Sequence, residues 1–318
     1  MRVLDADATR AALPYVGLAQ ALAGALARWK AGAVAAPPRQ RLALPGGGVL
    51  LVMPAAGERL AVVKAIGVCP GNPAQGLPLI LGEITVLDAA TGQVLARLDG
   101  PAATERRTAA LSLLAARTLA PDPAGPLLVV GAGTQARGHL EAFRQGLGTE
   151  RAWIAARTPA QAEALAAHGR SLGMDCRAVP LPQPSGHPAG NPGEEGGAFA
   201  AALAQASLVV TATASPTPVL PAEGLRLDAF LAAVGAHAPQ EAEIPAPLVQ
   251  RCRLYADMPE AAKAEAGDLI QANVDWDRVT PLADALDQPR PASGPVLFKT
   301  VGHALFDLAA AELAMGEW

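Results

Sequence analysis

The feature that most constrains the fold of this chain is a glycine-rich turn that directly follows a short apolar segment. The segment Leu127–Val130 has the length and composition of a buried strand, and residues 134–147 have a helical pattern. The turn between them has the spacing G-x-G-x-x-A, in the residues Gly131, Ala132, Gly133, Thr134, Gln135 and Ala136. A strand, turn and helix of this kind let the backbone approach a pyrophosphate at the helix N-terminus. The pattern therefore predicts a dinucleotide-binding site of the Rossmann type.

The segment after the turn continues as an alternation of strands and helices. A helix is expected over 159–172, and strands are expected at 152–156, 175–179, 208–213, 230–234 and 253–257. This alternation predicts an α/β fold with a parallel doubly wound sheet. The segment 184–197 is rich in Pro and Gly and is expected to form an exposed loop.

A different pattern precedes the glycine turn. Residues 9–31 are expected to form a helix, and residues 41–99 are expected to form short strands that include a hairpin of 79–87 with 94–98. A second helix is expected over 103–120, with Thr104 as its N-cap. The Pro-rich stretch 121–126 follows, and we place a domain boundary there.

The composition excludes several kinds of partner. The 318 residues carry a formal net charge of −4 and form no basic stripe, so a nucleic-acid partner is not expected. The three cysteines are widely spaced, match no metal-ligand pattern and indicate a reducing cytosol. Asp5, Asp7 and Pro14 do not fit a signal peptide, and no apolar run approaches the roughly 20 residues of a membrane span. We therefore expect a cytoplasmic protein with no metal, membrane or nucleic-acid partner.

The end of the second expected strand indicates which dinucleotide is bound. An acidic residue about 20 residues after the turn would hold the ribose 2′-hydroxyl of NAD. This chain instead has Ala155, Ala156, Arg157 and Thr158 there. Because a guanidinium can pair with a 2′-phosphate through two hydrogen bonds, Arg157 predicts that the cofactor is NADPH. NADH is the alternative cofactor, and Arg157 would then be an exposed surface arginine without a role in binding.

Further residues are expected at the cofactor because they follow strands. Ligands of open α/β sheets lie outside the carboxyl ends of the strands. The residues that end the strands beginning at 208 and 230 are Thr211, Ala212, Thr213, Val234 and Gly235. For either threonine alone, a local capping role fits the sequence nearly as well.

Three basic residues before the turn are candidates for a substrate carboxylate. Lys64 lies inside an apolar strand, where a cation is costly unless it is paired or lines a site. Arg107 lies near the start of a helix, where a cation opposes the helix dipole. Arg41 is the third candidate. A carboxylate ligand would supply a negative partner, although each residue alone also fits a salt bridge or an exposed position.

With these residues in place, the chain resembles the ornithine cyclodeaminase/mu-crystallin family over nearly its whole length. The other matching stretches are Asp88–Gly92, Leu98–Gly100, Thr104–Ala110, Val234–Ala236, Pro239–Ile244 and Phe298–Gly302. The resemblance implies a homodimer. It also implies an α+β substrate-binding and dimerisation domain of residues 1–121 and 298–318, and a Rossmann domain of residues 122–297.

The resemblance further implies roles for individual residues. Arg41, Lys64 and Arg107 would hold the substrate carboxylate. The NADP site would be lined by Gly131, Gly133, Ala136, Arg157, Thr158, Thr213, Val234 and Gly302.

One departure from the family pattern bears on the chemistry. The cyclodeaminases use an aspartate in a G-D-x-P stretch, and His237 stands at that position here. The difference disfavours ornithine cyclodeamination and an alanine dehydrogenase-like reaction. The chain is more similar to bacterial NAD(P)H-dependent reductases of Δ1-pyrroline-2-carboxylate and Δ1-piperideine-2-carboxylate, which form L-proline and L-pipecolate. Since histidine titrates near neutral pH, His237 is a candidate proton donor, as are Lys64 and an ordered water, and a loop histidine without a role is the alternative.

Three other functions fit a chain of this kind. The first is reduction of an acyclic imino acid, such as iminosuccinate or an N-alkyl imine, with the same cofactor. The second is an ornithine cyclodeaminase-type lyase that holds NAD permanently. The third is a mu-crystallin-like binder of small ligands, which the presence of both Lys64 and Arg107 disfavours.

Overall fold

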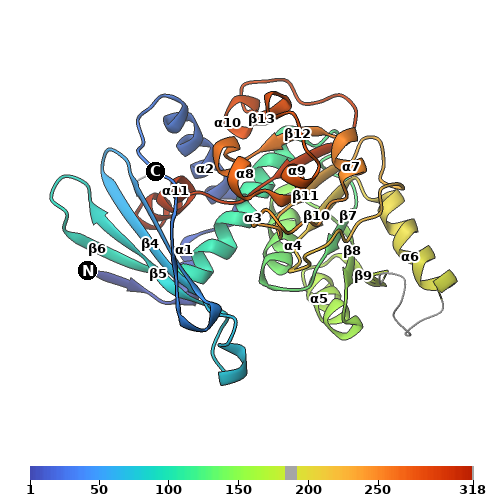
Figure 1. The fold of residues 1–318 in the computed structure, drawn as a ribbon, viewed down its shortest axis with the longest axis horizontal. Helices are drawn as coiled ribbons and strands as arrows, with labels where there is room; N and C mark the ends of the chain where they lie inside the picture. Colours follow the sequence, from blue (N-terminus) through green and yellow to red (C-terminus); the bar gives the residue numbers. More distant parts are fainter. Residues whose placement is uncertain (183–191, 317–318) are drawn as a thin grey trace. The chain divides into compact units, whose positions relative to one another are not determined.

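The computed structural model describes residues 1–182 and 192–316 and divides into two compact units (Figure 1). Unit 1 contains Met1–Leu111 and Gly302–Trp318, and unit 2 contains Ser112–Val301. The expected boundaries at 121/122 and 297/298 differ from these. The last strand of unit 2, β14 (Val296–Lys299), pairs along its whole length with a neighbouring parallel strand, so a boundary at 297/298 would cut through a paired strand.

Unit 1 contains a six-stranded sheet in the order β1-β6-β5-β4-β3-β2. Only the β1–β6 pair is parallel among these strands, and the other pairs are antiparallel. The strands are β1 (Arg2–Leu4), β2 (Gln40–Ala43), β3 (Val49–Ala56), β4 (Leu60–Val68), β5 (Ile80–Asp88) and β6 (Val94–Asp99). The predicted hairpin is confirmed as β5 and β6.

Unit 1 also contains the helices α1 (Ala6–Ala12), α2 (Tyr15–Lys30) and α11 (Ala304–Met315), and the first part of helix α3 (Gly100–Leu119). The C-terminal helix α11, red in Figure 1, packs against α2 and against strands β3 and β4. Side chains alternate between the two faces of a strand, and in β4 the buried set includes Val62, Lys64 and Ile66. The packing of α11 on β4 therefore brings the C-terminal helix close to Lys64, although the two are far apart in the sequence.

Two local predictions in unit 1 were wrong. The expected helix 9–31 is two helices, because Pro14 lies between them in an extended conformation and provides the N-cap position of α2. Thr104 does not cap α3. The helix begins at Gly100, and Asp99 caps it by accepting a 2.7 Å hydrogen bond from the Ala102 N–H.

Unit 2 contains an eight-stranded parallel sheet in the order β13-β12-β14-β11-β10-β7-β8-β9. Its remaining strands are β7 (Leu127–Val130), β8 (Arg151–Ala156), β9 (Asp175–Pro180), β10 (Leu208–Thr211), β11 (Phe230–Ala233), β12 (Arg253–Ala256) and β13 (Val279–Pro281). From β9 to β11 the strands follow the first five places, 3-2-1-4-5, of the doubly wound order of dinucleotide-binding domains. The sixth place is taken by β14, the last strand of the chain, and β12 and β13 lie beyond it. The predicted parallel sheet is confirmed, and its order reverses between β7 and β10.

The helices of unit 2 join these strands. They are α4 (Thr134–Leu147), α5 (Pro159–Ser171), α6 (Pro192–Gln205), α7 (Ala246–Arg251), α8 (Pro259–Glu265), α9 (Gly267–Gln271) and α10 (Leu282–Ala285). The predicted loop 184–197 falls in two parts. Residues 184–191 lie outside the described residues, and residues 192–197 belong to helix α6 rather than to a loop. Within residues 1–182 and 192–316, every helix is too short or too polar to cross a bilayer.

Candidate active site

The glycine turn lies at the carboxyl end of β7, where the sequence predicts it. The Gly131 N–H donates to the Ala155 carbonyl of β8 (2.8 Å), and Gly131 has a φ of +122°. A Cβ atom added at Gly131 would collide with the carbonyl oxygen of Ala212 on the loop after β10. Only glycine fits this backbone because both its φ and its close neighbour exclude a side chain.

Helix α4 begins at this turn, and no side chain caps its N-terminus. Gly133 occupies the N-cap position and carries no side chain that could accept from the first amides of the helix. The amide groups of a helix start and the helix dipole together favour an anion. Gly133 and Thr134 are exposed, whereas Ala136 is buried against the sheet, as the G-x-G-x-x-A pattern requires. The turn therefore fits a dinucleotide pyrophosphate.

The next residues along the predicted cofactor site follow β8. Arg157 and Thr158 are both exposed directly after the strand, and Thr158 is the N-cap residue of α5 without a side-chain cap bond. An exposed guanidinium at this strand end can reach a ribose 2′-phosphate. The choice between NADPH and NADH remains a prediction.

The ends of β10 and β11 are connected through a carboxylate. Thr211, at the end of β10, is buried, and Thr213 and Val234 are partly buried. Glu243, in the loop before α7, accepts hydrogen bonds from Thr211, Thr213 and Gly235. The sequence patterns indicate the two threonines and the glycine but give Glu243 no definite role, because its partners are far from it in the chain.

Unit 1 holds a separate group of charged residues around Lys64. The Lys64 Nζ lies 2.9 Å from Oδ1 and 2.7 Å from Oδ2 of Asp307 on α11. The Arg107 Nε lies 3.6 Å from the same Oδ1. Lys64, Arg107 and Asp307 are 1%, 6% and 0% exposed, so this is a buried group in which two cations share a carboxylate.

The electrostatic surroundings of Lys64 act against its charge. Burial, together with repulsion from Arg107 and Arg39, lowers the pKa of Lys64 to about 8, although Asp307 acts in the opposite direction. Removing a cation from water costs free energy, and like charges nearby add to that cost. An anionic ligand near the Lys64 ammonium would reverse the shift.

Besides Arg107, the arginine that acts on Lys64 is Arg39 and not the predicted Arg41. Arg41 is exposed on β2, whereas Arg39 is half-buried, acts on the charge of Lys64 and donates a hydrogen bond to the Gly302 carbonyl. Gly302 also lies close to Arg107, since a Cβ atom added there would be 2.7 Å from both terminal guanidinium nitrogens. Arg39 and Gly302 therefore belong to the group of residues around Lys64 and Arg107, whereas Arg41 is exposed on β2.

His237 lies in the loop after β11, and its side chain is 60% exposed. Its Nδ1 is 2.9 Å from the carbonyl oxygen of Gly235 and 3.8 Å from a carboxylate oxygen of Glu241. Both partners of the imidazole lie on the same loop as His237. The catalytic role of His237 therefore stays a prediction.

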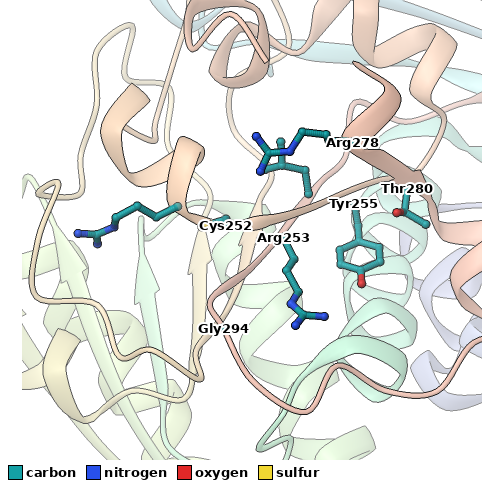
Figure 2. A pocket seen from close by; sticks show the side chains of 8 residues that line it. Cys252, Arg253, Tyr255, Arg278, Thr280 and Gly294 are labelled. Carbon is teal, nitrogen blue, oxygen red and sulfur yellow. The ribbon is translucent and has the colours of Figure 1, made fainter. Parts of the chain in front are cut away.

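A pocket of about 410 Å³ lies elsewhere in unit 2 (Figure 2). Arg253, Tyr255, Arg278 and Thr280 of its lining surround the hollow in Figure 2, and they come from β12, β13 and the turn before β13. Three strands, β14, β11 and β10, separate β12 from β7 in the sheet. This pocket is therefore distinct from the glycine turn and forms no part of the candidate site.

The family model for the "Ornithine cyclodeaminase/mu-crystallin family" matches residues 3–187 and 196–318. The chain belongs to this family. The predicted resemblance is thereby confirmed, and the match includes both the Lys64 strand and the glycine turn.

Individual relatives are similar over almost their whole length. Delta(1)-pyrroline-2-carboxylate reductase 1 of Burkholderia multivorans is 41% identical over 313 residues, which cover 98% of this chain and 94% of that protein. The Delta(1)-pyrroline-2-carboxylate/Delta(1)-piperideine-2-carboxylate reductase of Azospirillum brasilense is 40% identical over 312 residues, with the same coverage of 98% and 94%. A solved structure of the Thermococcus litoralis Delta(1)-pyrroline-2-carboxylate reductase with NADH and L-proline has a TM-score of 0.86 and 25% identity, and covers 100% of this chain and 97% of that one.

Proposed function

We propose that this protein is an NAD(P)H-dependent reductase of cyclic imino acids. It converts Δ1-pyrroline-2-carboxylate to L-proline and Δ1-piperideine-2-carboxylate to L-pipecolate. The observation that carries this proposal is the buried group of Lys64, Arg107 and Asp307, because it attracts a small carboxylate. The relative at 41% identity is a Δ1-pyrroline-2-carboxylate reductase, and the relative at 40% identity is named as a reductase of both substrates, which supports the same assignment here.

In this proposal the residues of unit 1 bind and orient the substrate. The Arg107 and Arg39 guanidinium groups and the Lys64 ammonium bind the carboxylate, and Asp307 holds Lys64 in place. When bound, the reduced nicotinamide supplies the hydride that adds to the carbon of the C=N bond. The imine nitrogen receives a proton, so the double bond becomes CH–NH. Orientation by a fixed carboxylate contact is the main contribution of these side chains.

The residues of unit 2 hold the cofactor. Gly131, Gly133 and the start of α4 bind the pyrophosphate, and Arg157 binds the 2′-phosphate that distinguishes NADPH from NADH. Ala132 lies in the same turn, Thr134 and Gln135 are the first two residues of α4, and Ala212 directly follows β10. Initial rates with NADPH and with NADH test the assignment of Arg157, since efficient use of NADH with poor use of NADPH would contradict it.

The proton on the imine nitrogen has two candidate donors on this chain, Lys64 and His237. Lys64 carries a proton at neutral pH, and its lowered pKa of about 8 makes that proton easier to release than an ordinary lysine's. If His237 is the donor, H237A lowers kcat at least about tenfold, because general acid catalysis typically contributes about 10²- to 10⁴-fold. An unchanged kcat in H237A assigns the proton to Lys64 or to an ordered water. Circular dichroism of H237A verifies that the variant is folded.

A panel of substrates tests the proposed function. Oxidation of NADPH and of NADH is followed with pyrroline-2-carboxylate, piperideine-2-carboxylate, iminosuccinate, and pyruvate mixed with methylamine. We expect the highest kcat/KM with a cyclic substrate. Higher kcat/KM with an acyclic imine would contradict the proposal, as would release of ammonia from ornithine without net consumption of cofactor. Tight binding of a small ligand without turnover of any substrate would indicate a mu-crystallin-like binder.

We also propose that the protein acts as a homodimer through unit 1. Large apolar side chains in one segment of this unit are exposed, namely Leu77 (49%), Leu79 (45%), Ile80 (38%) and Leu81 (45%). Exposed large apolar side chains concentrated in one segment support a protein–protein interface there. Sedimentation velocity over a range of concentrations tests this proposal, and a monomer at all concentrations would exclude it.

A further inference from the structure

Glu243 lies at the centre of a hydrogen-bond network at the carboxyl ends of two neighbouring strands. Its Oε1 accepts from the Thr213 N–H and the Thr213 hydroxyl, both at 2.7 Å. Its Oε2 accepts from the Thr211 hydroxyl at 2.9 Å and from the Gly235 N–H at 2.6 Å. Two donors come from the backbone and two from side chains, so one carboxylate fixes the loop after β10 to the loop after β11.

The backbone of Glu243 is fixed by a second carboxylate, that of Asp268. Oδ1 of Asp268 accepts from the backbone N–H groups of Glu243 (2.6 Å) and Ile244 (2.9 Å). The other oxygen of Asp268 lies 2.6 Å from the Lys299 Nζ, which also donates to the Ala236 carbonyl at 2.6 Å. These contacts leave the Glu243 side chain with a single position relative to the two strand ends.

The network is buried, and four hydrogen-bond donors face the Glu243 carboxyl group. Glu243, Asp268 and Lys299 are 0%, 1% and 0% exposed. Burial, together with the charge of Asp268, raises the pKa of Glu243, although Lys299 and the hydrogen bonds from Thr213 act in the opposite direction. An ionised carboxylate is an acceptor only, and four donors match its acceptor sites. An amide at this position would direct an NH₂ group at some of these donors.

The location of the network determines which part of the cofactor it serves. In a doubly wound sheet the two mononucleotide halves bind on either side of the point where the strand order reverses, outside the carboxyl ends of the strands. That point lies between β7 and β10 here. The glycine turn and Arg157 follow β7 and β8, so they serve the adenosine half. Thr213 and Gly235 follow β10 and β11, so they belong to the nicotinamide half.

We propose that Glu243 is the positioning residue of the nicotinamide half of the cofactor site. It holds the Thr213 and Gly235 loops at a fixed separation, so the nicotinamide ribose and ring bind in a defined place. This inference rests on the proposed nicotinamide cofactor but does not depend on which imine is reduced.

Binding of a whole cofactor and of a fragment separates this role from a purely structural one. Dissociation constants of NADPH and of adenosine 2′,5′-bisphosphate are measured by calorimetry for the wild type and for E243Q. We expect the Kd of NADPH to rise roughly 10- to 100-fold in E243Q, since displacement of groups by about 1 Å can cost that much. The Kd of the bisphosphate, which occupies only the adenosine half, stays within about twofold of the wild-type value. If the wild type prefers NADH, the probes are NADH and AMP.

Two further variants complete the experiment. T213V removes one of the four donors, and it should give the same split on a smaller scale if E243Q does not fold. E260Q is the matched control, because Glu260 on α8 is an exposed glutamate that forms an ion pair with Lys263 at 3.0 Å, and both constants should match the wild type. Equal losses for cofactor and fragment, or no loss for either, would overturn the proposal. Failure of the imine assays alone would leave these binding results unchanged.

Discussion

The two units of this protein contain buried charge groups of opposite composition. In unit 1, Lys64 and Arg107 both approach the carboxylate of Asp307. In unit 2, two carboxylates, Glu243 and Asp268, lie with one ammonium, that of Lys299. All of these side chains are less than one-tenth exposed. Because a buried charge is costly, each group needs a compensating arrangement, and the two units have different ones.

The compensation in unit 2 comes from the protein itself. Backbone N–H groups and threonine hydroxyls donate to Glu243, and backbone N–H groups and Lys299 compensate Asp268. In unit 1 the surroundings of Lys64 still disfavour its positive charge, as its pKa of about 8 indicates. The unit 2 group joins loops through hydrogen bonds within the protein, whereas in the proposed function the unit 1 group binds the anionic substrate.

Replacement of Lys64 should have the largest effect on catalysis. K64M removes the ammonium from the carboxylate site and leaves Asp307 buried with one cation fewer. Loss of one member of a buried charge pair costs about 2–5 kcal/mol, so kcat/KM should fall roughly 10²- to 10³-fold. The double variant K64M/D307N should regain stability in urea denaturation without regaining kcat/KM. A K64M enzyme with near-wild-type kcat/KM would show that unit 1 does not bind the substrate through this group.

Replacement of Lys299 should instead act mainly on stability. K299M leaves Asp268 without its ammonium partner at a site with no exposure, and the free energy of unfolding should fall by about 3–5 kcal/mol. Denaturation in urea measures this change, and K299M/D268N should recover part of it. The fall of kcat/KM at alkaline pH, which we attribute to loss of the Lys64 proton, should occur at the same pH as in the wild type. A shift of this fall in K299M would contradict the separation of the two groups.

The two arginines that precede β3 form a matched pair for a smaller effect. R39Q removes the guanidinium that acts on Lys64 and donates to Gly302, and kcat/KM should fall about tenfold or more, as expected for a charged hydrogen bond of roughly 1.5–3 kcal/mol. R41Q, two residues away on the exposed strand β2, should match the wild type. Steady-state kinetics of both variants measure the difference. The reverse ranking would restore Arg41 as the carboxylate ligand predicted from sequence.

The smallest effect is a shift in pH dependence. The pKa of Lys64 lies at about 8, so its ammonium predominates below that pH and is lost above it. Since only the ammonium attracts a carboxylate, kcat/KM should be level below pH 8 and fall about tenfold per pH unit above it. Because Arg39 lowers this pKa, R39Q should move the limb to higher pH by a few tenths of a unit, whereas R41Q should not. A limb that stays in place in R39Q would mean that another group titrates there.

How much the sequence predicted differs between the two units. The glycine turn, the helix after it and the parallel strands depend on local patterns, and the structure has them at the expected residues. The candidate site in unit 1 depends on side chains far apart in the chain. Lys64 and Arg107 were recognisable because a cation is unusual in an apolar strand or near a helix start. Asp307 gave no such signal, because one aspartate among the alanines of a C-terminal helix also fits an exposed position.

The sequence by itself determined the class of fold and the type of cofactor site, because glycine spacing and strand periodicity act within a few residues of each other. The tertiary structure decided which charges meet. Packing of α11 on β4 brings Asp307 to Lys64, and Arg39 rather than Arg41 acts on that lysine. The loop before α7 carries Glu243 to the ends of β10 and β11 in the same way. Such pairings depend on distances between segments that are remote in sequence, and no local pattern contains that information.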